Sequence, residues 1–292
     1  MFRFGPYDDE EIIKTPIKSK PFKKVLIKIL LILILVLSIA LYFYIPRIKY
    51  TLSSTKDYYY VESYFGPISN VEIKSVHKSK PVLAIAAKAF KNCSTLKTIK
   101  IPDGILVIDN NAFENCINLE NISLPSTLKI ISSNAFRGCT SLKSISLPEG
   151  IKRIIRGTFY DCINLTNINL PTSIEVIESY AFYNCTSLLS ITIPEEVFRI
   201  GDHAFLGCAS LKEVVIPSKV STIYAYTFSD CTQLSSITLP RRIKKIERKA
   251  FFNCPSLSKI YFNASEYVWE VVDIGEWNND LLNAETIFKP NF

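Results

Sequence analysis

The sequence predicts a repeat solenoid of the α/β type, mainly β, preceded by one membrane-spanning helix. The first observation is a pentapeptide of the form [AT]-F-x-x-C that recurs eight times, every 23 residues, without an insertion. The others are a strand-like apolar pattern between the copies and an apolar run over residues 25–46. A period of roughly 20 to 29 residues is typical of stacked coils that cover one another's apolar faces. The copies begin at Ala89, Ala112, Ala135, Thr158, Ala181, Ala204, Thr227 and Ala250.

The apolar run has the length of a transmembrane helix. Residues 25–46 are apolar apart from Lys28 and Ser38, and a lysine near the end of a span can extend its ammonium group to the membrane edge. Tyr42 and Tyr44 suit the aromatic belt at the interface. A helix buried in a globular domain is the alternative, but only a short tail precedes the run. We therefore expect a signal-anchor helix over residues 25–46.

The flanking cations predict the orientation of this helix. Seven Lys or Arg residues lie before or at the entrance of residues 29–45, and three lie shortly after it. Positive flanks stay in the cytoplasm, so we expect a basic cytoplasmic tail over residues 1–24 and repeats that are extracellular or lumenal, with the plasma membrane as the expected location. The competing interpretation is a cleaved signal peptide, with Ser38 and Ala40 near the cut.

The charge of the chain is concentrated ahead of the repeats. The net charge is +7, of which residues 1–50 carry +5, with 9 Lys or Arg and 4 Asp or Glu. The remainder carries only +2. A nearly neutral repeat region argues against nucleic-acid binding, whereas the basic tail suits the anionic cytoplasmic leaflet.

Each 23-residue unit predicts a short strand, a corner and an extended return. In the first copy, Ile99 and Ile101 alternate with Thr98 and Lys100, so the two isoleucines face inward. A proline then ends the strand, because it cannot donate to the ladder, and an I-x-x-I segment returns to the next pentapeptide. The residue two after each Phe is Asn, Gly or Asp, which tolerate a tight or left-handed turn. Repeated Phe, Cys, Leu and Ile residues are therefore expected to stack as core ladders.

The unit A-F-x-x-C-x-x-L-x-x-I-x-[IL]-P resembles the BspA-like leucine-rich repeats. The resemblance implies a right-handed coil stack over residues 82–262 with a parallel sheet on its concave face. Residues 47–81 then form a juxtamembrane segment and N-terminal cap. Residues 263–292 form a C-terminal cap, in which Asn263 replaces the repeat proline and Trp269 and Trp277 close the open end. The family is known mostly as surface proteins of bacteria and parasitic protists, which implies adhesion or a surface antigen.

The titratable residues do not predict an enzyme. All eight Cys occupy the repeat position, so they form a line and not the tetrahedron that zinc needs. Buried free thiols are favoured over disulfides between coils, although an exoplasmic location is oxidising. His77 and His203 lie in different coils, and His203 is expected to be a solvated surface residue. We expect no metal, no cofactor and no catalytic group. A lumenal enzyme, suggested by the topology alone, lacks a candidate constellation.

Two surfaces are candidates for binding an unidentified protein or glycan ligand. The outward strand positions form a polar concave face, where repeat proteins commonly bind. Tyr160 and Tyr183 occupy the same turn position in adjacent coils and predict an exposed apolar stripe. The concave-face candidates are Asn121, Ser123, Ser144, Ser146, Asn167, Asn169, Ser190 and Thr192.

Five glycosylation sequons follow the apolar run, and translocated repeats are expected to carry glycans at the exposed ones. These sequons begin at Asn92, Asn121, Asn164, Asn184 and Asn263. The leading hypothesis is a membrane-anchored, exoplasmic binding module. The alternative is a membrane-tethered interaction scaffold that faces the cytosol or a lumen.

Overall fold

The computed structural model describes residues 20–44 and 47–289, and in the first range it places the side chains of residues 24–39. The chain divides into two compact units, Met1–Ile45 and Pro46–Phe292. The first contains helix α1 (Lys20–Tyr44), whose described side chains are all exposed. Within the described ranges, no helix is long and apolar enough to cross a membrane, so the predicted span is not confirmed. Most of the predicted basic tail lies outside the described residues.

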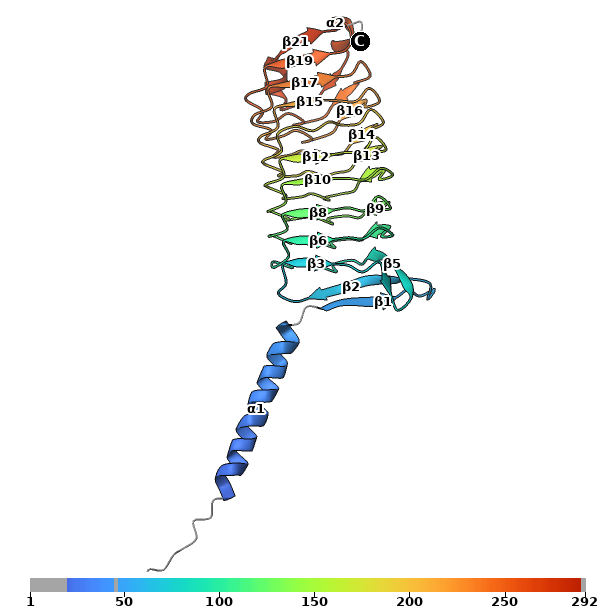
Figure 1. Cartoon of the computed structure of the whole chain (residues 1–292). Helices are drawn as coiled ribbons and strands as arrows, with labels where there is room; N and C mark the ends of the chain where they lie inside the picture. Colours follow the sequence, from blue (N-terminus) through green and yellow to red (C-terminus); the bar gives the residue numbers. More distant parts are fainter. Residues whose placement is uncertain (1–19, 45–46, 290–292) are drawn as a thin grey trace, which may run out of the picture. The chain divides into compact units, whose positions relative to one another are not determined.

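The second unit is a mainly β solenoid of about 10 turns with parallel strands, which confirms the predicted repeat fold (Figure 1). Where neighbouring strands of the repeats pair in its main ladder, they pair one repeat apart, as Ser144 does with Asn167. Within β10, Ile145 is buried and the flanking serines are exposed. We call the surface formed by these outward residues the sheet face. The strands are β3 (Asn70–Glu72), β6 (Thr98–Lys100), β8 (Asn121–Ser123), β10 (Ser144–Ser146), β12 (Asn167–Asn169), β15 (Glu213–Val215), β17 (Ser236–Leu239), β19 (Lys259–Phe262) and β21 (Glu285–Phe288).

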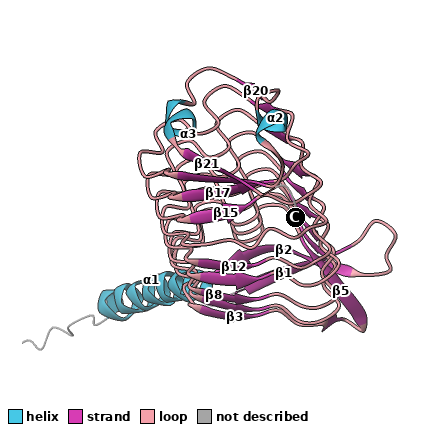
Figure 2. Ribbon diagram, turned by 90° about the horizontal axis from the view of Figure 1, so that it is seen from above, coloured by secondary structure: helices cyan, strands magenta, loops and turns pink. Residues whose placement is uncertain are grey.

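The returning I-x-x-I segments form a second ladder of short parallel strands, on the other side of the coils from the main ladder (Figures 1 and 2). From β7 to β18 the second residue of each pair is a buried isoleucine, as Ile154 is beside the exposed Arg153. The core therefore lies between the two ladders. The strands are β5 (Lys80–Ile85), β7 (Val107–Ile108), β9 (Ile130–Ile131), β11 (Arg153–Ile154), β13 (Val176–Ile177), β14 (Arg199–Ile200), β16 (Thr222–Ile223), β18 (Lys245–Ile246) and β20 (Asp273–Ile274).

The pentapeptides form the third side of each coil, which we call the turn edge. Their eight phenylalanines are fully or almost fully buried and stack with ring centroids 5.1–5.7 Å apart. The predicted turn residues have positive φ, for example Asn115 at 58° and Asp161 at 58°. A second left-handed position, two residues before each Phe, was not predicted. It holds Lys88, Asn111, Asn134, Gly157, Tyr180, His203, Tyr226 and Lys249.

Both strand ladders are interrupted at two junctions between coils, and the main ladder is also interrupted at a third, between β12 and residues 190–192. No described strand pairing joins β8 to β10 or β9 to β11, and none joins β14 to β16. The turn edge is continuous across the first of these junctions, where the Phe113 N–H donates to the Ala135 carbonyl at 2.8 Å. The coils are therefore held together at the turn edge where their strands are not paired.

The strand predicted at Ser190 and Thr192 is absent, because residues 190–192 have no strand assignment. The backbone bonds that approach this segment are long, at 3.4 Å from the Leu189 N–H to the Thr166 carbonyl and 3.3 Å from Lys212 to Leu189. These two bonds keep the coil attached to its neighbours next to the segment that has no strand. Both side chains are still exposed, as predicted.

The N-terminal end of the solenoid is covered by a hairpin of β1 (Arg47–Leu52) and β2 (Tyr59–Phe65), and β2 pairs in parallel with β5. Tyr64 stacks on Phe90 at 5.4 Å and extends the phenylalanine column by one ring. His77, in β4 (Val76–His77), stacks on Tyr50 at 4.6 Å. The hairpin thus supplies both backbone partners and an aromatic ring to the first coil.

At the other end, the cap contains two short helices, α2 (Glu266–Trp269) and α3 (Asn279–Asn283). Trp269 packs on Phe262 at 5.1 Å, as expected of a residue that closes the core. Trp277 does not close it: 54% of its surface is exposed, and its ring is next to the Lys249 ammonium group. The Trp277 prediction is therefore wrong.

Asn278 is the buried polar residue of the C-terminal cap, and the sequence analysis missed it. In earlier coils the backbone N–H of the pentapeptide Phe donates to a carbonyl of the following coil, that of the residue just before its Phe. Phe228 donates in this way to the Ala250 carbonyl. The last coil has no such neighbour, and the Phe251 N–H donates to Asn278 Oδ1 at 2.9 Å instead. Asn278 Nδ2 in turn donates to the carbonyls of Glu247 and Gly275. The Asn278 side chain thus accepts the hydrogen bond that the carbonyl of a further coil would otherwise accept.

The cysteines are free thiols that extend the hydrogen bonding of the turn edge. Seven of them donate to the carbonyl of the preceding coil's phenylalanine at 3.0–3.3 Å. Burial raises the pKa of Cys208 and Cys254 to about 12. Cys93, in the first pentapeptide, is half-buried and has only the Thr95 hydroxyl, at 3.7 Å, as a hydrogen-bond partner.

We expect one native thiol to react with maleimide well before the other seven, because only Cys93 is accessible. A Cys93→Ser variant should lose this fast phase, and unfolding without reductant should then release seven thiols. Fewer free thiols in that state would mean disulfides between coils.

The buried thiols also predict loss of stability in alkali. The fold raises the pKa of Cys208 and Cys254 from 9.0 to about 12, so it favours the protonated form. Stability should be complete below pH 9 and fall as the pH rises from there toward 12. Thermal unfolding of wild type and Cys208→Ala across this range measures the effect, and the variant should show the shallower decline.

Candidate functional site

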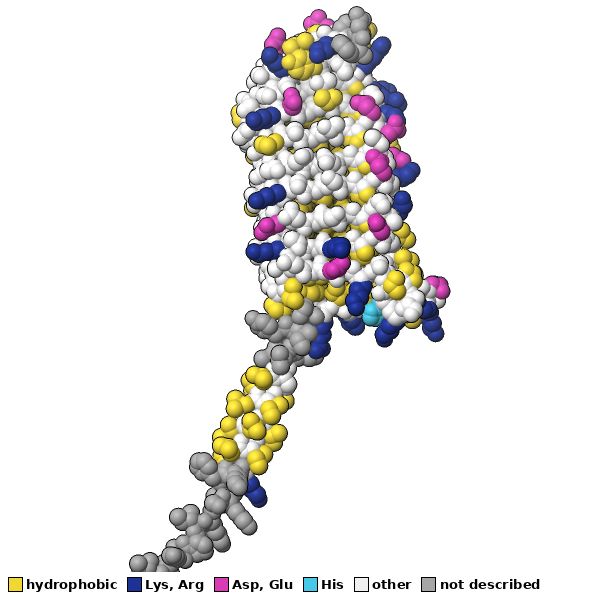
Figure 3. Space-filling model, in the orientation of Figure 1, with side chains coloured by type: hydrophobic (Ala, Val, Ile, Leu, Met, Phe, Trp, Pro, Cys, Tyr) yellow, Lys and Arg dark blue, Asp and Glu magenta, His cyan; other side chains and the backbone are white. Residues whose placement is uncertain are grey.

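The sheet face is polar along most of its length. All eight predicted residues, from Asn121 to Thr192, are exposed. In Figure 3 the side of the solenoid that carries β6 to β12 is largely white, the colour of uncharged polar side chains and backbone. Some rungs are bonded to one another, as Asn169 Nδ2 is to Ser146 Oγ at 3.1 Å. The predicted polar face therefore exists in the structure.

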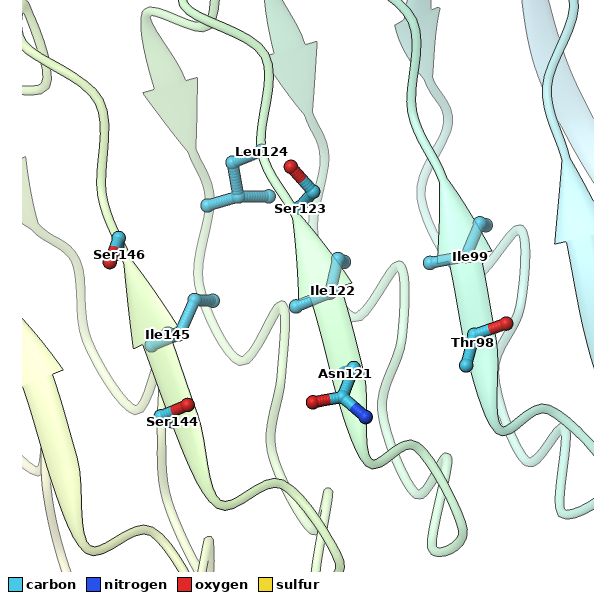
Figure 4. Close-up of a pocket in the computed structure, with 9 residues that line it drawn as sticks. All are labelled: Thr98, Ile99, Asn121, Ile122, Ser123, Leu124, Ser144, Ile145 and Ser146. Atoms are coloured by element: carbon cyan, nitrogen blue, oxygen red, sulfur yellow. The ribbon is translucent and has the colours of Figure 1, made fainter.

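A hollow of about 450 Å³ lies on the sheet face at the unpaired junction between β8 and β10. Four of the predicted residues line it, namely Asn121, Ser123, Ser144 and Ser146. Figure 4 shows them on the two strands, with the isoleucines between them. The other four predicted residues lie on later coils and do not contribute to the hollow.

At this junction, backbone N–H and C=O groups that would bond to each other in a regular ladder have no strand partner. Paired parallel strands satisfy each other's backbone N–H and C=O groups, but β8 and β10 do not pair. Ile122 in β8 is only half-buried, whereas its counterparts Ile99 and Ile145 are buried. The hollow thus combines backbone polar groups, hydroxyls, one amide and the edge of an apolar side chain. The interruption of the ladder was not visible in the sequence, because the repeat continues through it unchanged.

The predicted tyrosine stripe is present and continues into a second column, but Tyr160 and Tyr183 are half-buried, so the prediction of an exposed stripe is wrong. Tyr160 and Tyr183 stack with centroids 4.3 Å apart. Beside them runs a second column in which His203 stacks between Tyr180 and Tyr226, at 4.7 Å from each. His203 is therefore half-buried between two rings, and the prediction of a solvated surface histidine is wrong. Its tyrosine neighbours at the same repeat position were the available signal.

His203, Asp202 and Ser179 are linked by hydrogen bonds at the turn edge, but not in the arrangement of a catalytic triad. Ser179 and His203 both bond to the carboxylate of Asp202, at 3.0 Å for His203. Although burial opposes it, hydrogen bonds from these two residues lower the pKa of Asp202. Nucleophile activation requires the base next to the hydroxyl, and here the acid separates them. Within the described part of the chain, no three His, Cys, Asp or Glu side chains could hold a metal ion.

The sequon asparagines differ in accessibility. Asn92, Asn121 and Asn164 are exposed, whereas Asn184 and Asn263 are half-buried. Hydrogen bonding does not separate Asn164 from Asn184, since Asn164 Nδ2 donates to the Thr140 carbonyl at 2.7 Å and Asn184 Nδ2 donates to Asp161 Oδ1 at 2.8 Å. Asn121 is part of the hollow, so a glycan there would obstruct the sheet face.

Comparison with known proteins gives a family and a fold. The family model described as "BspA type Leucine rich repeat region" matches residues 68–160 and 152–270, in six copies. No curated protein matches. The leucine-rich-repeat protein TpLRR of T. pallidum is 25% identical, with a TM-score of 0.53, and the alignment covers 83% of this chain and 96% of that one.

Two other solved structures are more distant. A leucine-rich cell surface protein of Faecalibacterium prausnitzii is 19% identical, with a TM-score of 0.46 over 77% of this chain and 95% of that one. The pneumococcal vaccine antigen PcpA is 16% identical, also with a TM-score of 0.46, over 84% of this chain and 86% of that one.

Proposed function

Because the chain belongs to the BspA-type leucine-rich-repeat family, we propose that it is a non-enzymatic binding module that recognises an extended segment of another protein. The observation that carries this proposal is the hollow at the unpaired junction between β8 and β10. A peptide backbone presents alternating donors and acceptors, which complement the free backbone groups and the side chains of Asn121, Ser123, Ser144 and Ser146. Binding in this manner is a form of recognition by main-chain hydrogen bonds.

The test uses a displayed library of random peptides, selected on the full-length chain in detergent micelles. We expect the recovered peptides to lose at least tenfold in affinity for Ser146→Arg, because the long cationic side chain occupies the hollow. The matched control is Thr238→Arg, on β17 of the same sheet face and away from the hollow. Equal binding to both variants, or no enrichment, would refute a site at this junction.

We also propose that residues 25–46 anchor the chain in a membrane and that the repeats lie on the outside, where binding would serve adhesion or antigen display. The proposal is supported by the cation bias of the flanks and by the exposed apolar side chains of residues 25–27, 29–37 and 39 in α1. The alternative is a tethered scaffold whose repeats face the cytosol or a lumen. Free thiols favour this alternative, since they are typical of reducing compartments.

Glycosylation distinguishes the two orientations. When the full-length chain is expressed in a eukaryotic cell, we expect glycans on the exposed Asn92 or Asn164, and a mobility shift after enzymatic deglycosylation. Gln in place of both asparagines should remove most of the shift, whereas Gln in place of Asn184 should change it little. An unshifted band, with a C-terminus protected from protease on intact cells, would place the repeats inside.

A further inference from the structure

The two aromatic columns of the turn edge each end in a guanidinium group. Arg137 lies over the ring of Tyr160, 4.5 Å from its centroid, at the end of the Tyr160–Tyr183 column. Arg156 lies over Tyr180 at 5.2 Å, at the end of the column that continues through His203. Stacking on a ring uses the face of a guanidinium and leaves its N–H edge available.

A hollow of about 430 Å³ lies where these column ends meet, lined by the two arginines, Tyr160, Tyr180, Asn134 and Gly157. Gly157 explains why it is open. It occupies the left-handed position that holds Tyr180 in the next coil, with φ at +64°, so the column lacks one side chain here. A Cβ on Gly157 would lie 2.3 Å from Asn134 Oδ1. The missing side chain creates the space.

The local backbone does not favour the tyrosine beside this space. Tyr180 has φ at 60°, and bulky residues are uncommon in the left-handed region. All eight coils have a left-handed residue here, and Tyr226 is a second tyrosine among them, so the geometry of the coil imposes this conformation on Tyr180.

The lining of the hollow is rich in donors and lacks a carboxylate. Among the described ion pairs, none involves the guanidinium of Arg137 or Arg156. The nearby carboxylates are occupied: Glu178 accepts from the Arg156 backbone N–H and pairs with Arg153, and Asp161 accepts from Asn184. The free N–H groups therefore suit an anionic ligand.

We propose that this hollow binds an acidic sugar residue, one that carries a carboxylate. The planar carboxylate accepts hydrogen bonds from the two guanidinium edges. Sugar hydroxyls bond to the Asn134 amide and the tyrosine hydroxyls. The volume is within the range of small-ligand sites, roughly 300–1,000 Å³, and exceeds what a single ion needs. The site goes beyond the proposed function, because it lies on the turn edge and not on the sheet face, and either proposal can fail alone.

The experiment titrates the full-length chain in detergent micelles with glucuronic acid, N-acetylneuraminic acid, glucose and inorganic sulfate, followed by saturation-transfer NMR and calorimetry. We expect at least one of the two acids to bind at least tenfold more tightly than glucose and sulfate. Binding of neither acid, glucose binding equal to that of the acids, or sulfate binding equal to that of the better acid would overturn the proposal. In the last case the site would be one for simple anions.

Two variants test the location independently. Gly157→Asn restores a residue that other coils carry at this left-handed position, and only the mobile end of Asn134 must move, so we expect a folded protein that has lost acid binding. The double variant Arg137→Gln with Arg156→Gln should bind at least tenfold more weakly. Lys152→Gln is the control, an exposed cation that pairs with Glu175 and does not line the hollow. Unchanged binding in the double variant would overturn the assignment.

Discussion

Replacing Phe159 with Ala should destabilise the solenoid by about 3–5 kcal/mol, the usual effect of removing a buried phenylalanine. Phe159 is completely buried and stacks between Phe136 and Phe182, at 5.7 and 5.5 Å. Its removal breaks the column that joins three coils. Backbone bonds hold the rest of each coil in place, so the cavity cannot collapse fully. Chemical unfolding followed by circular dichroism measures the loss.

Phe198→Ala is the matched control for this experiment. The same atoms are removed, but 52% of the Phe198 surface is exposed. We expect a change below about 1 kcal/mol, because most of the ring already contacts water. Equal effects of the two substitutions would mean that the phenylalanine column does not stabilise the fold.

Replacing Asn278 with Ala should destabilise the C-terminal cap by about 2–4 kcal/mol. The Phe251 N–H and the carbonyls of Glu247 and Gly275 lose the amide that bonds to them, and a buried polar group without a partner costs roughly 1–3 kcal/mol. In a solenoid such a loss acts first on the neighbouring coil. The end of the rod should therefore unfold before its centre.

Tryptophan fluorescence can detect the unfolding of the cap separately from that of the rest of the solenoid. Its only two tryptophans, Trp269 and Trp277, both lie in the cap. In Asn278→Ala the fluorescence transition should precede the circular dichroism transition, whereas the two should coincide in the exposed control Asn279→Ala. Coincident transitions in both variants would show that the cap does not unfold separately.

The resemblance to TpLRR extends to nearly all of that protein, at 96% of its length. Its identity of 25% nevertheless leaves the surfaces free to differ. Gly157, whose missing side chain opens the hollow at the turn edge, belongs to a variable position of the repeat.

The repeat by itself determined which side chains are core. A residue that recurs every 23 positions occupies the same place in each coil, so the Phe, Cys, Leu and Ile ladders follow from one copy. The Asn, Gly and Asp turn positions followed from backbone sterics, which are local. The eight polar residues of the sheet face, including Ser144 and Ser146, followed from the alternation of a strand.

The tertiary structure alone decided where that regularity ends. Whether β8 pairs with β10 depends on the spacing of whole coils, which no single repeat encodes. The stack of His203 between Tyr180 and Tyr226 unites residues 23 positions apart, through a left-handed turn that their types do not favour. Asn278 acts as a cap only because the last coil has no neighbour to accept the Phe251 N–H. In each case the cause is a contact between two coils. The sequence of one coil specifies only the residues that this coil contributes to the contact.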